Sequence, residues 1–299
     1  MTNLNVTVVI PNYNGLELLK KNLSSVIKSA ENKENGISEI IIVDDASTDS
    51  STAFIKKKFP QVKIIKHTVN RGFSSAVNTG VRMSKGNIVA LLNSDVEVSL
   101  NFLVYVLPHF NDAKVFGVSL HEGGYSWAKG IFKEGYIVHS PAPERGSAHE
   151  TFWISGGSGV FRRSMWIALG GFDEKLFKFY WEDVDLSYRA HKRGFLLLWE
   201  PRSLVFHKHE SVTGVRFSKR QLTTMQETNQ LVFIWKDLIS GNLFRKHIRG
   251  VIARLRKHPG YARIVILALL KIKDIKHARK KEKKEGKVSD EAIFAKFTD

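Results

Sequence analysis

The side chains best suited to chemistry in this sequence are carboxylates, in three groups that lie far apart along the chain. They are Asp44 and Asp45, then Asp95, and then Glu182, Asp183 and Asp185. Hard oxygen ligands of this kind suit Mg²⁺ or Mn²⁺, and such a cation can bridge to a diphosphate. A carboxylate beside other carboxylates also has its pKa raised, which suits a general base. The pattern indicates metal-assisted chemistry on a phosphate-bearing substrate, without a covalent nucleophile.

The sequence also argues against several other kinds of site. The chain contains no cysteine, which excludes a disulfide scaffold, a thiol nucleophile and a cysteine-ligated zinc or iron–sulfur site. The phosphate-loop patterns Gly-x4-Gly-Lys-Ser/Thr and Gly-x-Gly-x-x-Gly do not follow the first apolar run. The His-Glu-x-x-His and Gly-x-Ser-x-Gly patterns are missing too, so we expect neither a zincin nor a serine hydrolase.

The elements that could position the acids alternate between strand and helix over the first hundred residues. Short apolar runs predict strands at 6–10, 40–43, 62–65 and 88–92. Helical spacing predicts helices at 16–27, after Asp49 and at 74–83, and the Asp49 carboxylate is expected to cap the second of these. This alternation predicts an α/β fold with a mostly parallel sheet that helices cover on both faces.

Polar clusters follow three of the predicted strands, at residues 11–15, 44–49 and 93–95. Ligands of open parallel sheets bind beyond the carboxyl ends of the strands, so one interpretation is a shared site at this edge. The alternative is that the clusters are only turns, which favour Asn, Asp, Gly and Ser. Three clusters on one edge, two of them acidic, favour the shared site.

The later part of the chain changes character twice. Residues 115–150 combine glycine, proline and aromatic residues with weak periodicity, which predicts irregular strands and loops. Strands are expected at 195–199 and 204–206, and helical spacing takes over from about residue 221. We therefore expect a catalytic domain over residues 1–220 and a basic, helical C-terminal extension over residues 221–299.

The C-terminal extension carries most of the excess positive charge. The formal net charge of the chain is +17, and residues 245–287 hold 16 Lys or Arg against 3 Asp or Glu. The same stretch is predicted to place Ile248, Val251, Ile252 and Leu255 on one helix face, which suits an anionic membrane surface. The alternative is that this face packs on the body of the protein. Aromatic residues are not interleaved with this charge, so nucleic acid is not an expected partner.

The start of the chain lacks a basic, apolar leader, and no apolar run approaches the roughly 20 residues of a spanning helix. We therefore expect a cytoplasmic protein, either free or peripheral on the inner face of the membrane.

Six motifs occur in the order found in family 2 glycosyltransferases, and the sequence resembles that family over residues 5–210. The motifs are Val9–Gly15, Ile42–Asp49, Asn70–Gly80, Leu91–Asp95, Gly170–Glu174 and Trp181–Leu186, the last followed by Arg189 and Gly194. The rhamnosyltransferase-like branch is the most similar, because it too tends to have Asn-x-Asp where other branches have Asp-x-Asp. The resemblance implies a GT-A fold (Rossmann-like) followed here by C-terminal helices, a nucleotide-sugar donor, and transfer that inverts the anomeric centre.

The resemblance also implies which residues hold the donor. A carboxylate near the base suits the N3–H donor of uracil or thymine. Asn93, Ser94 and Gly157 would line the same site. The loop at residues 11–15, with Pro11, Asn12 and Tyr13, and either Asp45 or Asp44 would hold the base and ribose. Arg71 and Asn78 would line the same pocket, and the alternative for Arg71 is a surface position.

Asp95 would coordinate Mg²⁺ or Mn²⁺ on the donor diphosphate, where the cation offsets charge on the leaving group. Asn93 stands where Asp-x-Asp has its first acid and adds no negative charge, which predicts weaker metal affinity or partial metal dependence. Glu97 would either compensate for the negative charge that Asn93 lacks or face solvent. His207 would be a further metal or diphosphate contact, and His209, two residues on, competes for that role.

Asp183 is predicted to be the base that takes the acceptor proton, with Glu182 positioning the acceptor. The alternative is that these acids only begin a helix, where negative charge favours the dipole. Asp185 is expected to be structural and to pair with Arg189 one turn on.

We thus expect an inverting glycosyltransferase that moves a hexose or deoxyhexose from a UDP- or dTDP-sugar to a hydroxyl of a glycan or lipid-linked acceptor, as in cell-surface polysaccharide synthesis. The alternatives are a nucleotidyltransferase acting on a sugar phosphate and a non-catalytic, basic membrane-binding protein.

Overall fold

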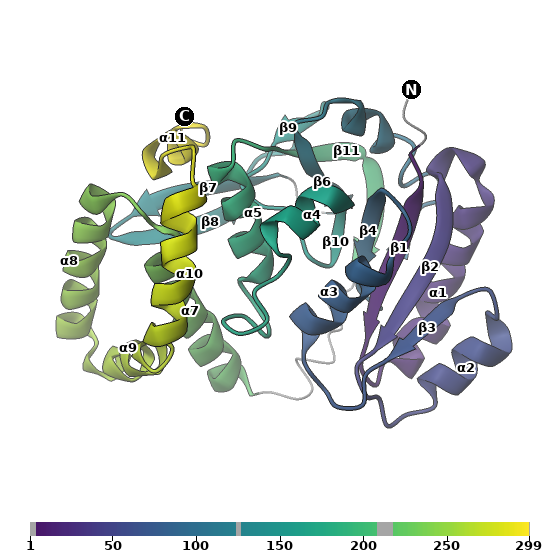
Figure 1. The fold of residues 1–299 in the computed structure, drawn as a ribbon, viewed down its shortest axis with the longest axis horizontal. Coiled ribbons are helices and arrows are strands. Elements are labelled where there is room, and N and C mark those ends of the chain that lie inside the picture. Colours follow the sequence, from purple (N-terminus) through teal and green to yellow (C-terminus); the bar gives the residue numbers. More distant parts are fainter. Residues whose placement is uncertain (1–3, 124–126, 208–217, 299) are drawn as a thin grey trace.

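A nine-stranded sheet forms the centre of the fold, and Figure 1 shows helices on both sides of it. The computed structural model describes residues 4–123, 127–207 and 218–298. The strands run in the order β3-β2-β1-β4-β10-β6-β11-β5, and β9 pairs with β11. Their bounds are β1 (Val6–Asn12), β2 (Ile37–Asp44), β3 (Lys63–Lys66), β4 (Ile88–Leu92), β5 (Val96–Val98), β6 (Val115–Glu122), β9 (His149–Glu150), β10 (Ser158–Arg162) and β11 (Leu196–His207).

Strands β1 to β4 pair in parallel, as the sequence predicts. Strand β1 lies between β2 and β4, and its register places Asn12 opposite Asp44. The predicted strands at 6–10, 40–43, 62–65 and 88–92 are confirmed, with β3 shifted by one residue and β2 longer at both ends. Since parallel strands end at the same edge, the polar residues that follow β1, β2 and β4 come to one side of the sheet.

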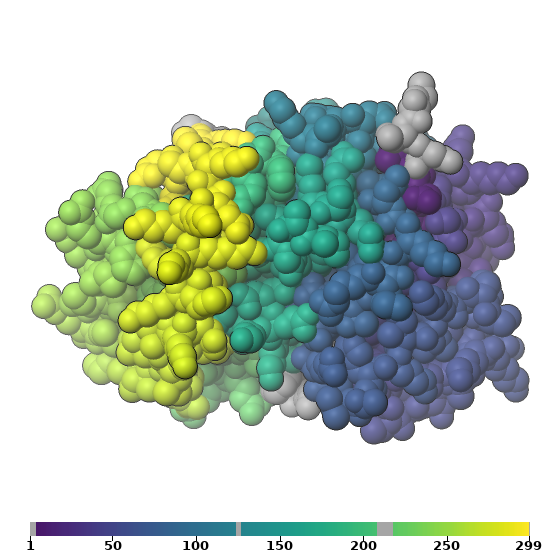
Figure 2. Space-filling model, viewed as in Figure 1, coloured from purple at the N-terminus to yellow at the C-terminus, as the bar shows by residue number. Residues whose placement is uncertain are grey.

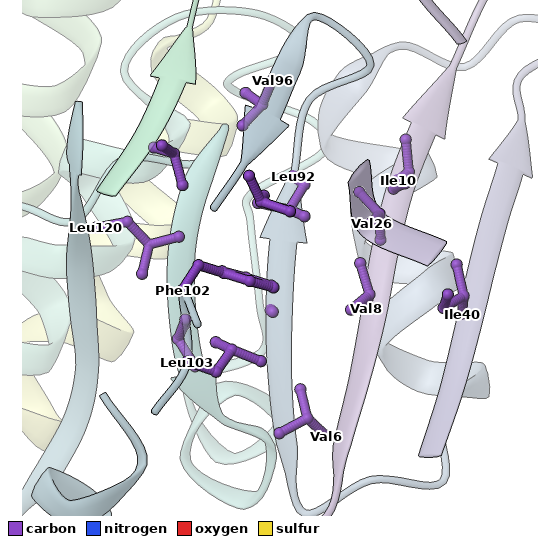
Figure 3. Close-up of a cluster of buried hydrophobic side chains, with 14 of the residues drawn as sticks. Val6, Val8, Ile10, Val26, Ile40, Leu92, Val96, Phe102, Leu103 and Leu120 are labelled. Carbon is purple, nitrogen blue, oxygen red and sulfur yellow. The ribbon is translucent and has the colours of Figure 1, made fainter. Parts of the chain in front are cut away.

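Each face of the sheet has its own apolar cluster, because successive side chains of a strand point to opposite faces. Val8 and Leu92 pack on one face with Val26 of α1 and with Phe102, and Figure 3 shows this cluster. Val9 of β1 and Ile41 and Val43 of β2 pack on the other face with α3, α4 and α5. The prediction of helices on both faces is therefore confirmed. The helices are α1 (Leu16–Glu31), α2 (Ser51–Lys58), α3 (Phe73–Met83), α4 (Arg163–Leu169) and α5 (Glu182–Lys192).

Asp49 ties the starts of two helices together. One carboxylate oxygen accepts a hydrogen bond from the backbone N–H of Ser51, the first residue of α2 (3.0 Å), but Ser50 and not Asp49 stands at the N-cap position. The other accepts from the Leu16 backbone N–H of α1 (2.9 Å), a contact that the sequence did not indicate. The first two helix N-termini are thereby fixed beside the edge where the polar clusters meet.

The middle of the chain is more regular than its sequence predicts. Residues 115–150 hold strand β6 of the main sheet, a separate hairpin of β7 (Ala128–Lys133) and β8 (Tyr136–Pro141), and the short β9. The two strands expected at 195–199 and 204–206 are one strand, β11, whose register shifts between Glu200 and Leu204. These segments become strands by pairing with strands distant in the sequence, and local periodicity does not reveal such pairing.

Five helices form the C-terminal part and pack against the hairpin and α5. Figure 2 shows them, in green to yellow, against the teal middle of the chain. One apolar cluster joins them to Trp127, Tyr188 and Trp199. The predicted boundary near residue 220 stays a prediction, but shared apolar packing crosses it. The helices are α7 (Lys219–Asp237), α8 (Gly241–Lys257), α9 (Ala262–Leu269), α10 (Ile272–Glu285) and α11 (Asp290–Ala295).

The four residues expected on one apolar face of α8 differ in burial. Val251 is buried in the shared cluster, and Leu255 packs against it. Ile248 and Ile252 are 42% and 44% exposed. Packing on the body, the alternative interpretation, therefore holds for half of the face. Among the described residues, no helix combines the length and apolar character needed to cross a bilayer.

A buried ionic cluster fastens the last helix to α5. Asp290 accepts hydrogen bonds from Lys192 Nζ (2.6 Å) and from the Tyr188 hydroxyl (2.7 Å). Its other oxygen accepts from the backbone N–H groups of Ile239 and Ser240. Asp290 and Lys192 are 1% and 3% exposed, so loss of either partner would leave the other charge buried and unpaired.

We expect Asp290→Ala to lower the free energy of unfolding by about 3–5 kcal/mol, because breaking a buried ion pair costs about this much. Asp274→Ala removes the same group from an exposed position on α10 and is expected to change it by less than about 0.5 kcal/mol. Urea denaturation of both variants measures the difference. Equal stability of the two variants would contradict the anchoring role.

Candidate active site

Asn12 and Asp44, at the ends of β1 and β2, lie in direct contact. The Asn12 amide donates to Asp44 Oδ1 (3.0 Å) and to the Ser51 hydroxyl (3.0 Å), and both residues are buried. Asp44 Oδ2 accepts from the Ser47 backbone N–H (3.3 Å). Pro11 and Tyr13, beside Asn12, are only partly buried. The structure thus brings four residues of the predicted nucleotide set to one place.

Asp45 organises the loop that leads into α3. Its carboxylate accepts hydrogen bonds from the backbone N–H groups of Arg71 (2.9 Å) and Gly72 (2.8 Å) and contacts His67 Nδ1 at 2.7 Å. Gly72 has φ +92°, which favours glycine. The Arg71 side chain is exposed, while its backbone joins Asp45.

The side chain of Asn78 forms hydrogen bonds with a different loop, at residues 172–174. Its amide group donates to the Phe172 carbonyl (2.8 Å) and to Glu174 Oε1 (2.9 Å), and its oxygen accepts from the Phe172 N–H (3.0 Å). Both amide hydrogens are therefore used to hold residues 172–174 against α3. Its place in a nucleotide pocket stays a prediction, and these contacts do not favour it.

The two predicted metal ligands are adjacent. His207 Nε2, at the end of β11, lies 3.1 Å from Asp95 Oδ1, and Nδ1 lies 3.1 Å from Glu122 Oε2. Burial opposes charge on this imidazole, but the hydrogen bonds with Asp95 and Glu122 raise the pKa of His207 to about 9. His209 lies outside the described residues.

A cation would fit the chemistry of this pair if it displaced the imidazole proton, because a carboxylate oxygen and a neutral imidazole nitrogen are both cation ligands and lie 3.1 Å apart. Asp95 and His207 would hold it, with donor phosphate oxygens completing the shell. In the described part of the chain, no three His, Asp or Glu side chains form a ready-made metal site. Glu97 is exposed on β5 and faces solvent, the second of the two outcomes expected for it.

Glu122 is a site residue that sequence reasoning missed. It ends β6, is 8% exposed, and accepts a hydrogen bond from the Ser158 hydroxyl as well as contacting His207. The available signal was an acid two residues beyond the run 115–120, comparable with Asp95, which lies three residues beyond the run 88–92. That run was hidden in a stretch predicted to be irregular.

A glycine loop joins the predicted metal ligands to the predicted base. Asn93 N–H donates to the Gly157 carbonyl (2.8 Å), and a Cβ on Gly157 would lie 2.4 Å from the Asn93 amide nitrogen. Gly156 N–H donates to Asp183 Oδ2 (3.2 Å). Ser94 follows Asn93, and its hydroxyl lies beside Gly15. Asn93 and Asp183 are therefore connected through two hydrogen bonds, to the consecutive residues Gly157 and Gly156.

Asp183 has the properties of a base that works near neutral pH. Burial raises its pKa, Glu122 adds to the effect, and hydrogen bonds from the Gly156 and Val184 N–H groups limit the rise to about 6. Burial and the neighbouring Asp183 charge also raise the pKa of Glu182 well above its usual value. Glu182 Oε2 is buried without a hydrogen-bond partner.

Asp185, two residues on, behaves oppositely. It pairs with Arg189 (2.7 Å), which confirms the expected contact, and with Lys236 of α7. Burial opposes ionisation, but Arg189 and Lys236 together lower the pKa of Asp185 to about 2. Asp185 is therefore a permanently charged structural residue, as predicted.

A pocket of about 390 Å³ opens beside Glu182 and Asp183, the two acids whose pKa is raised. Tyr180 and Trp181, directly before α5, have φ of +63° and +73°, an unfavourable backbone for bulky residues that functional sites often retain. The Trp153 indole N–H is buried there without a partner. The lining combines rings, amides and acids: His139, Trp153, Tyr180, Trp181, Glu182, Asp183, Val184, Gln226, Glu227 and Gln230.

The chain matches the model of Glycosyl transferase family 2 over residues 7–169. A pre-mycofactocin glycosyltransferase of Mycobacterium tuberculosis is 31% identical over 216 residues, which cover 69% of this chain and 43% of the relative. An N-acetylglucosaminyl-diphospho-decaprenol L-rhamnosyltransferase of the same species is 26% identical over 212 residues, 58% of this chain and 68% of the relative.

Among solved structures, GalNAc-T7 with UDP, GalNAc and Mn²⁺ has a similar fold, with a TM-score of 0.63 at 18% identity over 86% of this chain and 57% of that chain. This similarity confirms the predicted GT-A fold. The chain spans less than half the length of the first relatives that it matches. The family model covers more than half of the chain, and a rhamnosyltransferase is among the relatives. The chain therefore belongs to glycosyltransferase family 2, as its motifs indicate.

Proposed function

We propose that this protein transfers a hexose or deoxyhexose from a UDP- or dTDP-sugar to a hydroxyl of a glycan or lipid-linked acceptor, with inversion, in cell-surface glycan synthesis. One observation carries the proposal. A carboxylate with a pKa of about 6, Asp183, borders a pocket with four rings and is joined through Gly156, Gly157 and Asn93 to Asp95. A base and a diphosphate-holding group at neighbouring positions are what a single displacement needs.

On the donor side, residues 11–13 and Asp44 would receive the base and ribose. The relative crystallised with UDP supports a uridine donor, and thymine offers the same N3–H. A bound Mg²⁺ or Mn²⁺ would supply Lewis-acid stabilisation of the departing diphosphate. Asp95 and His207 would orient the diphosphate oxygens toward that cation.

On the acceptor side, the pocket beside Asp183 suits a sugar. Flat rings such as Trp153 and Trp181 provide apolar faces for a pyranose, while the side-chain amides of Gln226 and Gln230 can exchange hydrogen bonds with hydroxyls. The Trp153 N–H and Glu182 Oε2 are buried without a hydrogen-bond partner in the protein, and sugar hydroxyls would supply one to each. Asp183 would take the proton of the attacking hydroxyl as the new glycosidic bond forms.

A cytoplasmic location on the inner face of the membrane remains part of the proposal. Exposed apolar residues within the basic 245–287 segment include Ile248 and Ile252 on α8, Leu269 at the end of α9, and Leu270 directly after it. An anionic bilayer would bind such a surface through apolar insertion and charge. A relative whose acceptor is linked to decaprenyl diphosphate supports this setting.

Asp183→Asn is expected to lower kcat by about 10²–10⁴-fold, because the acceptor hydroxyl loses its base. UDP binding in the presence of Mn²⁺ should stay unchanged. Glu97→Gln makes the same change at an exposed acid and should retain full activity. The assay is transfer from radiolabelled UDP-sugars to a membrane glycan extract. Near-normal turnover of Asp183→Asn would remove the proposed base.

The pH dependence of kcat/KM should follow the ionisation of Asp183. The base works only when it is deprotonated, so the rate is constant above about pH 7 and falls about tenfold per pH unit below the pKa of about 6. UDP binding measured by calorimetry over the same range separates this effect from loss of the donor. A rate that is level down to pH 4.5 would contradict the assignment.

Asp95→Ala is expected to weaken Mn²⁺-dependent UDP binding by about tenfold or more, because one charged cation ligand is lost. Glu97→Ala, two residues along on the exposed side of β5, is the matched control and should bind as the unmodified protein does. Calorimetric titration with UDP, with Mn²⁺ and with EDTA, measures both. Identical metal dependence in the two variants would exclude Asp95 as a ligand.

A further inference from the structure

A basic groove lies between α8 and the tip of the β7–β8 hairpin, apart from the site described above. It encloses about 970 Å³. One acid, Glu134, is among its lining residues. Two rings and four cationic side chains make up most of its wall: Phe132, Tyr136, Lys246, Arg249, Arg254 and Lys257.

The hairpin tip is held firmly against α8, so the groove is a fixed feature. A Cβ on Gly250 would lie 2.4 Å from the Glu134 carbonyl oxygen, so the helix and the turn meet backbone to backbone. Buried His247 donates from Nδ1 to the Gly135 carbonyl (2.6 Å), while its Nε2 accepts from the Trp235 indole (2.8 Å). Both ring nitrogens are thus used to fix the turn.

Most of the positive charge in the groove is not neutralised by the protein. Within the residues that the structure describes, Lys246, Arg249 and Lys257 are exposed and have no ion-pair partner. Arg254 pairs with Glu227 and lies over the Tyr261 ring at 4.1 Å. A concave surface on which four cationic side chains outnumber one acid attracts negative charge, and clustered Lys and Arg donors suit phosphate oxygens.

The groove is linked to the pocket beside Asp183. Glu227 lines that pocket, and its partner Arg254 lines the groove. On β8, Tyr136 belongs to the groove and His139 to the pocket. Side chains three residues apart on a strand point to opposite faces, so Tyr136 and His139 lie on opposite sides of the hairpin about 10 Å apart, and the Arg254–Glu227 pair is the contact shared by the groove and the pocket.

The groove and the exposed apolar side of α8 do not form one surface. Ile248 and Ile252 stand two residues before and after Gly250, so at about 100° per residue they project from the opposite side of the helix. A flat bilayer on Ile248 and Ile252 would leave the groove turned away from its headgroups. The charge in the groove therefore fits a ligand that enters it singly.

We propose that this groove binds a phosphate or diphosphate group carried by the acceptor, while the acceptor sugar occupies the pocket at Asp183. The inference rests on the proposed function and narrows its acceptor to a phosphate-bearing glycoside. Lys246, Arg249 and Lys257 contact the phosphate oxygens, and Arg254 with Glu227 separates the phosphate and sugar positions.

The probe is inorganic pyrophosphate, titrated calorimetrically in EDTA and low salt so that no cation draws it to the donor site. Combined Lys246→Ala, Arg249→Ala and Lys257→Ala should weaken its binding by about tenfold or more. Combined Lys273→Ala, Lys276→Ala and Lys280→Ala removes the same charge from exposed positions of α10 and should change it by less than about twofold. Retained affinity in the groove variant, or equal loss in both, would overturn the proposal.

A second arm distinguishes the phosphate of an acceptor from that of a bilayer. Vesicles of phosphatidylglycerol and phosphatidylcholine in equal parts should sediment with the groove variant as they do with the α10 variant. Loss of vesicle binding in the groove variant alone would make headgroups the occupant and overturn the proposal. UDP binding with Mn²⁺ tests the proposed function separately, because its failure leaves the pyrophosphate result unaffected.

Discussion

Negative charge buried at one edge of the sheet is the constraint on which this structure depends. Asp44, Asp45 and Asp95 are 2–4% exposed. Carboxylates removed from water are destabilising unless donors surround them. The loops at this edge supply those donors, through the backbone at Arg71 and Gly72 and the imidazole of His207. Loop conformation and site geometry are therefore set by the same interactions.

Helix α5 shows how neighbouring acids can be given opposite properties. Asp185 faces Arg189 and Lys236 and has its pKa lowered to about 2, whereas Asp183 faces backbone N–H groups and has its pKa raised to about 6. Two residues along a helix differ by about 200° in direction, which is enough to place one carboxylate in an ionic core and the other at a pocket. Divergent environments of this kind separate structural acids from reactive ones.

The sequence predicted what local patterns and ordered motifs report, and missed what distant pairing creates. The four parallel strands, α3 and the Asp185–Arg189 pair were predictable because each depends on spacing within one segment. Glu122 was not, because β6 becomes a strand by pairing with β10 and β11, which lie some 40 and 80 residues later. Asn78 matched a motif, yet its amide holds Phe172, a contact that no spacing rule specifies.

The C-terminal helices connect the pocket beside Asp183 to the ionic core around Asp185. On α7, Lys236 pairs with buried Asp185, while Gln226 and Gln230 line the pocket two to three turns earlier. The same helix carries Glu227, whose partner Arg254 belongs to α8 and the basic groove. A shift of α7 would therefore alter the pocket beside Asp183 and leave a charge unpaired in the core, which opposes such a shift. Residues on the pocket side of α7 and on α8 can vary without touching the strand ends that would hold the nucleotide. Under the proposed function, the acceptor would thus be held by a different part of this packed unit than the donor.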